Sequence, residues 1–100
     1  MFKLMYDGGS RGFHMTFGNG YTASVQFGAG NYGDNYNANR GRYEGGDVPN
    51  SSTQAEMAVW KPNGDFVQMD GGTDVYGYID ADEVLKIMNW AAAQPKDEAV

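Results

Sequence analysis

The alternation of apolar and polar residues over positions 13–27 constrains this chain more than any other feature. Odd positions in both arms are apolar and even positions are polar, which is the period expected of half-buried strands. A two-residue loop would set Phe17 opposite Thr22, pairing an apolar residue with a polar one. A three-residue loop ending at Gly20 sets Phe17 opposite Tyr21 and keeps the pairs apolar. We therefore predict a hairpin over 13–27 in which Gly20 adopts the left-handed conformation of a G1 bulge.

The stretch 55–69 predicts a second hairpin. Its turn holds Pro62, which presets the backbone, and Gly64, which supplies a left-handed residue. The pairs that this turn sets opposite one another are Val59 with Val67, Met57 with Met69, and Trp60 with Phe66. Both faces of this hairpin are therefore apolar. We expect it to lie nearer the centre of a sheet, with one face free to take a helix.

The clearest helix start lies at Asp80. This residue type is a good N-cap, and Glu83 three positions later completes a capping box. The helix is predicted over 81–93 and stops before Pro95. Its predicted apolar face comprises Val84, Leu85, Ile87, Met88, Ala91 and Ala92. Because a helix this short is not stable alone, we expect its apolar face to dock on the sheet.

The remaining segments complete a single domain over residues 1–100. Residues 1–7 alternate weakly and predict an edge strand, residues 75–79 predict a further strand, and residues 95–100 form a tail. A chain of this length can build one core without covalent staples. We predict an α+β fold, with an antiparallel sheet of about four to six strands built from two hairpins. One C-terminal helix packs on one face of that sheet.

Residues 28–53 differ in kind from the rest of the chain. The segment holds six glycines, five asparagines and three tyrosines, and such a long connection in a small domain is usually functional or disordered. Its tyrosines favour an ordered loop, because flexible linkers contain few aromatic residues. We predict a binding site formed by Tyr32, Tyr36, Arg40, Arg42 and Tyr43. Trp60 and Phe66 of the second hairpin are further candidates for contact with a partner.

The run from Gly28 to Gly33 matches the pattern G-x-G-x-x-G and directly follows a predicted strand. A dinucleotide site requires these glycines to open a helix within a βαβ unit. The residues that follow are poor helix formers, so we reject that interpretation. An anion-binding nest is an alternative. In it, Arg40 and Arg42 would pair with phosphate, and a tyrosine of the loop would stack on a base.

No residue pattern in the chain predicts catalysis. His14 is the only histidine and cysteine is absent, which leaves no cysteine-based metal site. None of the serines lies in a nucleophile elbow beside a base. Acidic residues gather over 65–83, where caps and turns explain most of them. The others suit a basic partner or a surface that imitates nucleic-acid phosphates. We predict a non-enzymatic protein with no metal and no cofactor.

The net charge of −6 bears on the kind of partner. It disfavours direct binding to nucleic acid or to an anionic membrane. No apolar run is long enough to span a bilayer, and the first residues are too polar for a signal peptide. We expect a cytoplasmic protein without membrane contact that binds another protein. A homodimer is an alternative.

Two stretches resemble small accessory proteins of tailed phages and prophages. One is residues 12–32, GFHMTFGNGYTASVQFGAGNY, and the other is residues 55–93, with a tryptophan-bearing strand, an acidic turn and a short helix. The resemblance implies a phage accessory factor in the bacterial cytoplasm that binds and inhibits a host protein, antiviral-defence proteins included. The alternative function is to bind and sequester a nucleotide or cyclic-nucleotide signal with the Gly-rich loop.

Overall fold

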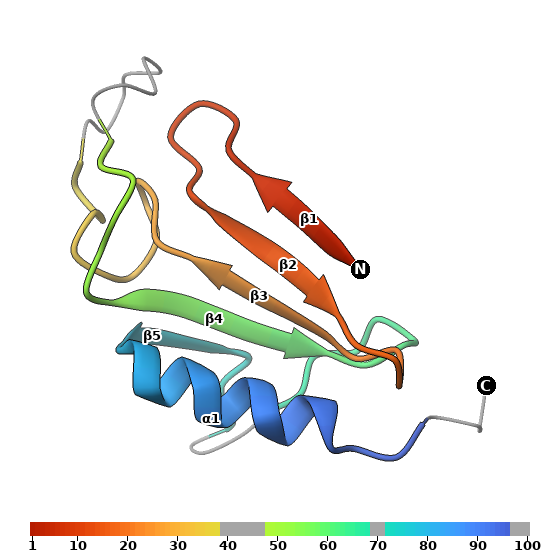
Figure 1. Cartoon of the computed structure of the whole chain (residues 1–100). Helices are drawn as coiled ribbons and strands as arrows, with labels where there is room; N and C mark the ends of the chain where they lie inside the picture. The colour runs from red at the N-terminus through yellow and green to blue at the C-terminus, as the bar shows by residue number, and fades with distance from the viewer. Residues whose placement is uncertain (39–47, 69–71, 97–100) are drawn as a thin grey trace.

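The computed structural model describes residues 1–38, 48–68 and 72–96 (Figure 1). Within these described residues, five strands form one antiparallel sheet in the order β1-β2-β3-β4-β5, and a single helix, α1, packs on one face of it. The elements are β1 Phe2–Met5, β2 Gly12–Thr16, β3 Thr22–Gln26, β4 Ala55–Trp60, β5 Val75–Ile79 and α1 Ala81–Ala92. The predicted α+β fold is confirmed, and so is the edge strand predicted within residues 1–7.

The β2–β3 hairpin has the predicted register. Met15 pairs with Ala23 across the two strands. The Phe17 N–H donates to the Tyr21 carbonyl at 2.8 Å, and the Gly20 N–H donates to the Phe17 carbonyl at 2.9 Å. Gly20 has a φ of 88°, which is the left-handed conformation expected at the last position of this loop. The three-residue loop is therefore confirmed.

Two rows of apolar side chains cross the sheet on the face that α1 covers, because directly opposed residues share a face. The rows are Leu4, Phe13, Val25, Met57, Tyr76 and Phe2, Met15, Ala23, Val59. The members on β3 and β4 are buried and pack with Ile87 and Ala91 of α1. Toward β1 the same rows extend beyond the part of the sheet that the helix covers (Figure 1). The core therefore occupies only one part of an apolar face that spans the whole sheet.

The helix begins where the sequence predicts. The Asp80 carboxylate accepts a hydrogen bond from the Glu83 N–H at 2.9 Å, so the N-cap is confirmed. At the other end, the Asn19 side chain in the β2–β3 loop donates to the carbonyls of Ala91 and Gln94, each at 2.8 Å. These bonds fix the hairpin tip to the end of the helix. Within the described residues, no helix has the length and apolarity needed to traverse a bilayer.

The helix face that meets the sheet is narrower than the predicted one. Val84, Ile87, Met88 and Ala91 pack in or against the core. Leu85, which the sequence placed on this face, is 57% exposed. A helix presents an apolar stripe of limited width to a sheet, and Leu85 lies outside that stripe.

The turn of the second predicted hairpin is correct, but its return arm is shorter than predicted. The Lys61 N–H donates to the Asp65 carbonyl at 2.8 Å, and Trp60 forms an isolated bridge with Phe66. The chain then leaves β4, and β5 takes over the edge, so that Met57 pairs with Tyr76. Met69, the predicted partner of Met57, lies outside the described residues. A strand rich in β-branched and aromatic residues pairs with β4 in its place.

We predict that Gly20→Val lowers the free energy of unfolding by about 1–3 kcal/mol, since a β-branched residue is strained at positive φ. A Cβ at this position would also lie 2.7 Å from the Pro62 ring. Gly18→Ala is the control, because a Cβ there has nothing within 4 Å. Urea denaturation of both variants measures the difference. Equal losses of stability would contradict this assignment of the turn.

Candidate functional site

Three tyrosine rings form a stack beside β5. The Tyr32 and Tyr36 rings lie 5.5 Å apart with an interplanar angle of 10°. On its other side, Tyr32 stacks on Tyr78 at 5.8 Å and 23°. Tyr32 is 46% exposed and Tyr78 is 57% exposed. We call these three residues the tyrosine stack.

Backbone contacts hold Tyr32 against the sheet. Its N–H donates to a carboxylate oxygen of Glu56 at 2.9 Å, and its carbonyl accepts from the Tyr78 N–H at 2.8 Å. A Cβ at Gly77 would lie 2.6 Å from the Cβ of Tyr32, so only glycine allows this close approach. The backbone around Tyr32 therefore packs against the start of β4 and the end of β5.

Polar side chains tie the rest of this segment to the fold. Asn35 is buried, and its side-chain amide donates to the carbonyls of Phe27 at 2.8 Å and Ser51 at 3.1 Å. The Asp34 carboxylate accepts from the N–H of Thr53 at 2.8 Å and from its hydroxyl at 2.6 Å. These bonds lower the pKa of Asp34 from its ordinary value of 3.8. The segment thus presents its tyrosines from a fixed backbone.

The Gly-rich run does not offer its amides to a phosphate. Residues 28–38 form turns and no helix, which agrees with rejecting a dinucleotide site. Every N–H from Gly28 to Tyr32 has an acceptor within the protein. The acceptors are, in chain order, the Asn31 side chain, the carbonyls of Gly9, Tyr36 and Gly28, and the Glu56 carboxylate. A nest with free N–H donors is absent from this stretch.

The predicted site residues fall into separate places. Tyr32 and Tyr36 lie together in the tyrosine stack, whereas Arg40, Arg42 and Tyr43 lie outside the described residues. Trp60 and Phe66 contact each other edge to face at 5.8 Å. They lie at the other end of β4 from Glu56, roughly 14 Å away at strand spacing. The structure therefore places Tyr32 beside Tyr36 and Trp60 beside Phe66, but these two pairs lie apart from each other.

Tyr78 was missed by the sequence analysis, which placed it only in a strand. Its φ of 57° turns it out of the regular alternation of β5. The available signal is Gly77 between two tyrosines, since a glycine within a strand often marks the close approach of another backbone. Here that backbone is the one of Tyr32.

His14 lies on the face of the sheet opposite α1, edge-on to Trp60 at 5.1 Å. Partial burial, followed by the nearby Lys3 cation, lowers its pKa from the ordinary value of 6.5. Ser24 is its cross-strand partner. The Ser24 hydroxyl accepts from the Gln26 side chain at 3.3 Å, and His14 does not hydrogen bond to it. This pair therefore lacks the contact by which a base activates a serine.

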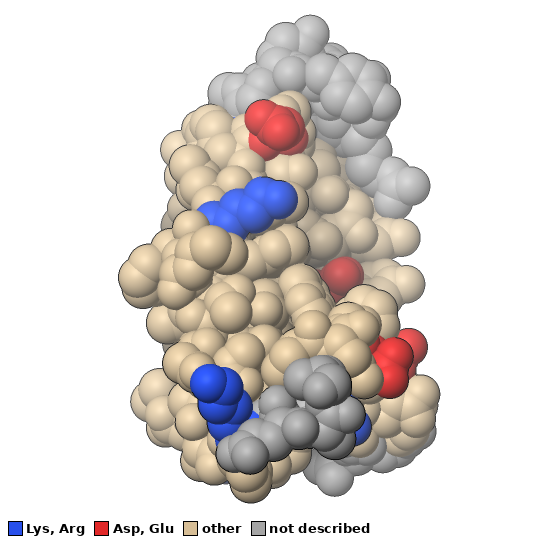
Figure 2. All heavy atoms as spheres, turned by 90° about the vertical axis from the view of Figure 1, so that its right-hand side faces the viewer, with Lys and Arg blue, Asp and Glu red and all other residues tan. Residues whose placement is uncertain are grey.

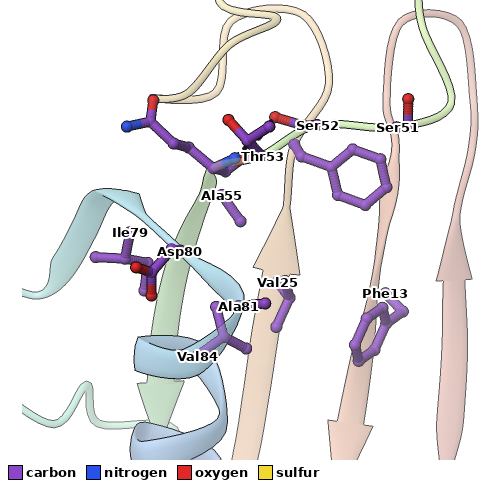
Figure 3. Close-up of a pocket in the computed structure, with 12 residues that line it drawn as sticks. Phe13, Val25, Ser51, Ser52, Thr53, Ala55, Ile79, Asp80, Ala81 and Val84 are labelled. Atoms are coloured by element: carbon purple, nitrogen blue, oxygen red, sulfur yellow. Dashed lines mark hydrogen bonds between the residues drawn. The ribbon is translucent and has the colours of Figure 1, made fainter.

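An open pocket of about 300 Å³ lies between the start of α1 and the strands (Figure 3). Phe13, Val25 and Ala55 give it an apolar floor, and Ser52 and Thr53 lie along its rim. Among the described residues that line it, the one carboxylate is that of Asp80, which caps the helix. Among the described residues, no group of three or more His, Asp or Glu side chains is placed to hold a metal ion.

We predict that Asn35→Ala lowers the free energy of unfolding by about 1–3 kcal/mol, because two partly buried hydrogen bonds to backbone carbonyls are lost. Asn37→Ala is the matched control in the same loop, since Asn37 is exposed. We expect that variant to stay within about 0.5 kcal/mol of the parent. Denaturant titration measures both. An Asn35 variant as stable as the Asn37 variant would contradict the anchoring role.

His14 predicts a pH dependence of stability. Its pKa is lowered in the folded state, so below pH 6.5 the unfolded chain binds more protons than the folded one. We expect the free energy of unfolding to fall as the pH drops through 6.5, and to fall less in His14→Gln. Melting temperatures of both proteins across this range provide the measurement. Parallel curves would show that His14 does not contribute.

Comparison with protein families, with curated proteins and with solved structures finds no match to this chain. No residue role is therefore transferred from another protein.

Proposed function

We propose that this protein is a non-enzymatic binding protein that contacts a protein partner through the tyrosine stack. The observation that carries the proposal is the pair of exposed rings, Tyr32 and Tyr78, stacked on each other and fixed to the sheet by a backbone hydrogen bond. Large rings with few rotatable bonds lose little entropy on binding. Exposed aromatic residues of this kind are the usual anchors of protein interfaces.

The charge around the stack favours a basic partner. The Asp34 carboxylate has a lowered pKa and is therefore ionised at neutral pH. The chain as a whole carries a net charge of −6. Charge at the rim of an interface steers association and selects partners more than it adds affinity. We therefore expect a partner with an apolar centre and basic residues around it.

The resemblance to phage accessory proteins directs the search for that partner. It makes a bacterial host protein the first candidate, and inhibition of that protein, including a component of antiviral defence, the proposed outcome of binding. Arg40, Arg42 and Tyr43 belong to the same loop in sequence and are included in the proposed contact. Trp60 and Phe66 form a second surface that a large partner can reach.

We predict that Tyr32→Ala or Tyr78→Ala weakens binding of the partner by more than about 1 kcal/mol, as expected of an anchor residue. Each variant should stay within about 1 kcal/mol of the parent in stability. The partner is first captured from bacterial lysate, and its affinity is then measured with purified proteins. Leu85→Ala is the matched control, because Leu85 is 57% exposed, the same fraction as Tyr78.

Three outcomes distinguish the candidates. Loss of affinity in the tyrosine variants alone supports the proposal. Equal affinity in all variants contradicts it and moves the search to Trp60 and Phe66. A nucleotide ligand would instead stabilise the parent by about 2.7 kcal/mol at a hundredfold excess over its dissociation constant. Thermal denaturation with a panel of nucleotides and cyclic nucleotides tests that alternative, for which the loop amides offer no donors between Gly28 and Tyr32.

A further inference from the structure

The two edge strands of the sheet, β1 and β5, differ in their backbone contacts with segments outside the sheet. On β5, the Tyr78 N–H donates to the Tyr32 carbonyl of the loop that follows β3. On β1, no other strand or loop of the described residues pairs with the outer side. Phe2 and Leu4 on this strand are 76% and 74% exposed. An open edge with exposed apolar side chains is a template for pairing with another chain.

The hydrogen-bonding pattern shows which backbone groups of β1 face outward. Met1 and Thr16 exchange both of their bonds, at 2.9 and 2.8 Å. Since bonded and non-bonded pairs alternate in an antiparallel ladder, the next bonded pair is Lys3 with its partner on β2. The N–H and C=O groups of Phe2 and Leu4 therefore point away from β2. The residues with the exposed side chains are also those with the open backbone groups.

The exposed side chains of β1 extend the apolar face of the sheet. Leu4 lies in one row with Phe13, and Phe2 lies in the other with Met15. Beside them is an open cavity of about 340 Å³. It is lined by Leu4, Tyr6, Arg11, Gly12, Phe13, Phe27 and Asn50. The side of the molecule shown in Figure 2 carries only scattered charges on a largely uncharged surface.

We propose that a second copy of this chain pairs with β1, antiparallel, about a twofold axis at Leu4. Leu4 then exchanges two backbone hydrogen bonds with Leu4 of the second copy. Phe2 pairs with Tyr6 of the second copy, and the reverse pair forms by symmetry. All of these side chains lie on one face and bury one another. Phe2 of each copy thereby lies next to the other copy's cavity, which Tyr6 and Leu4 help to line.

Charge and hydrogen bonding select this register among the neighbouring ones. Outward-facing residues can bond only to outward-facing residues, so the register can shift only in steps that keep this parity. A twofold axis at Lys3 would set two like charges directly opposite each other, which is unfavourable. An axis at Met5 would set Phe2 opposite Gly8, which lies in the β1–β2 turn and has no side chain to pair with it. The axis at Leu4 places Lys3 opposite Met5 of the second copy and avoids both penalties.

A second copy fits this edge better than an unrelated chain because the edge is complementary to itself. The same short strand supplies the donors, the acceptors, the aromatic side chain and the cavity beside it. The strand is short, so the interface falls at the low end of specific interfaces, near or below about 1,200 Å². We therefore expect a dimer whose population rises with concentration. It uses the edge opposite the tyrosine stack, so it is independent of the proposed function.

Sedimentation equilibrium of the parent and of Leu4→Lys tests the dimer. The variant sets two cations at the twofold axis, and the dissociation constant should rise by at least about tenfold. Because Leu4 is mostly exposed, the monomer should stay folded, which circular dichroism checks. Leu85→Lys, on the exposed side of α1, is the control and should dimerise like the parent. A parent that is monomeric at millimolar concentration, or a Leu4 variant that dimerises equally well, overturns the proposal.

Disulfide trapping tests the register separately. The chain has no cysteine, so each introduced thiol can be followed alone. Lys3 and Met5 of the other copy form a non-hydrogen-bonded pair, in which side chains come close enough to bridge. The double variant Lys3→Cys/Met5→Cys should form a covalent dimer on oxidation. The single variants should not, because each pairs with itself only in one of the rejected registers. Cross-linking of a single variant in preference to the double one overturns the axis at Leu4.

Discussion

A single helix has to cover a sheet that is wider than the helix. Five strands spaced by about 4.8 Å place the outer two roughly 19 Å apart, whereas a helix with its side chains is about 10–12 Å across. The helix α1 contacts β3 and β4 and buries the centre of both apolar rows. The two flanks of the sheet are therefore not covered by α1. The surfaces of this protein at those flanks are formed by other segments of the chain.

At the β5 flank, the loop that follows β3 packs against the end of the strand. Tyr32 is held against Gly77 so closely that no side chain fits between them. At the β1 flank, Arg11 connects two segments of the chain. It is almost fully buried, and its guanidinium donates to the carbonyls of Gly8 and Val48 and to the side chain of Asn50. These hydrogen bonds join the β1–β2 turn to the end of the loop that holds Val48 and Asn50, but they leave the outer edge of β1 open.

Local patterns predict the parts of this fold that local interactions determine. Alternation and the position of Gly20 are enough to place the register of β2 and β3, and the side chain of Asp80 is enough to start the helix. The pairing of β4 is different, because two later segments compete for the same edge. Phe66 begins that pairing and Tyr76 continues it, and nothing between them in the sequence indicates where the exchange occurs.

The candidate site can likewise be predicted only in part from local sequence patterns. Composition identifies the loop, yet several of its residues have structural work that composition does not reveal. Asn35 donates to the carbonyls of Phe27 and Ser51, and Asp34 accepts from Thr53. Stacking of Tyr32 on Tyr78 joins residues that are distant in the chain, so no window of sequence contains it. What remains for recognition is therefore more specific than the loop as a whole, namely rings that the fold holds in place but does not bury.

The two proposals have a geometric consequence together. Pairing through β1 joins two sheets edge to edge and leaves the tyrosine stacks at the outermost strands. With ten strands in the joined sheet, the stacks are on the order of 40 Å apart before twist is considered. Two weak contacts that engage one partner assembly at this spacing act as an intramolecular pair and bind far more tightly than either alone. A partner with repeated or symmetric binding surfaces would gain from this spacing, whereas a monomeric partner would meet each stack separately. Dimerisation at one edge therefore changes which partners the other edge can hold, although no contact links the two sites.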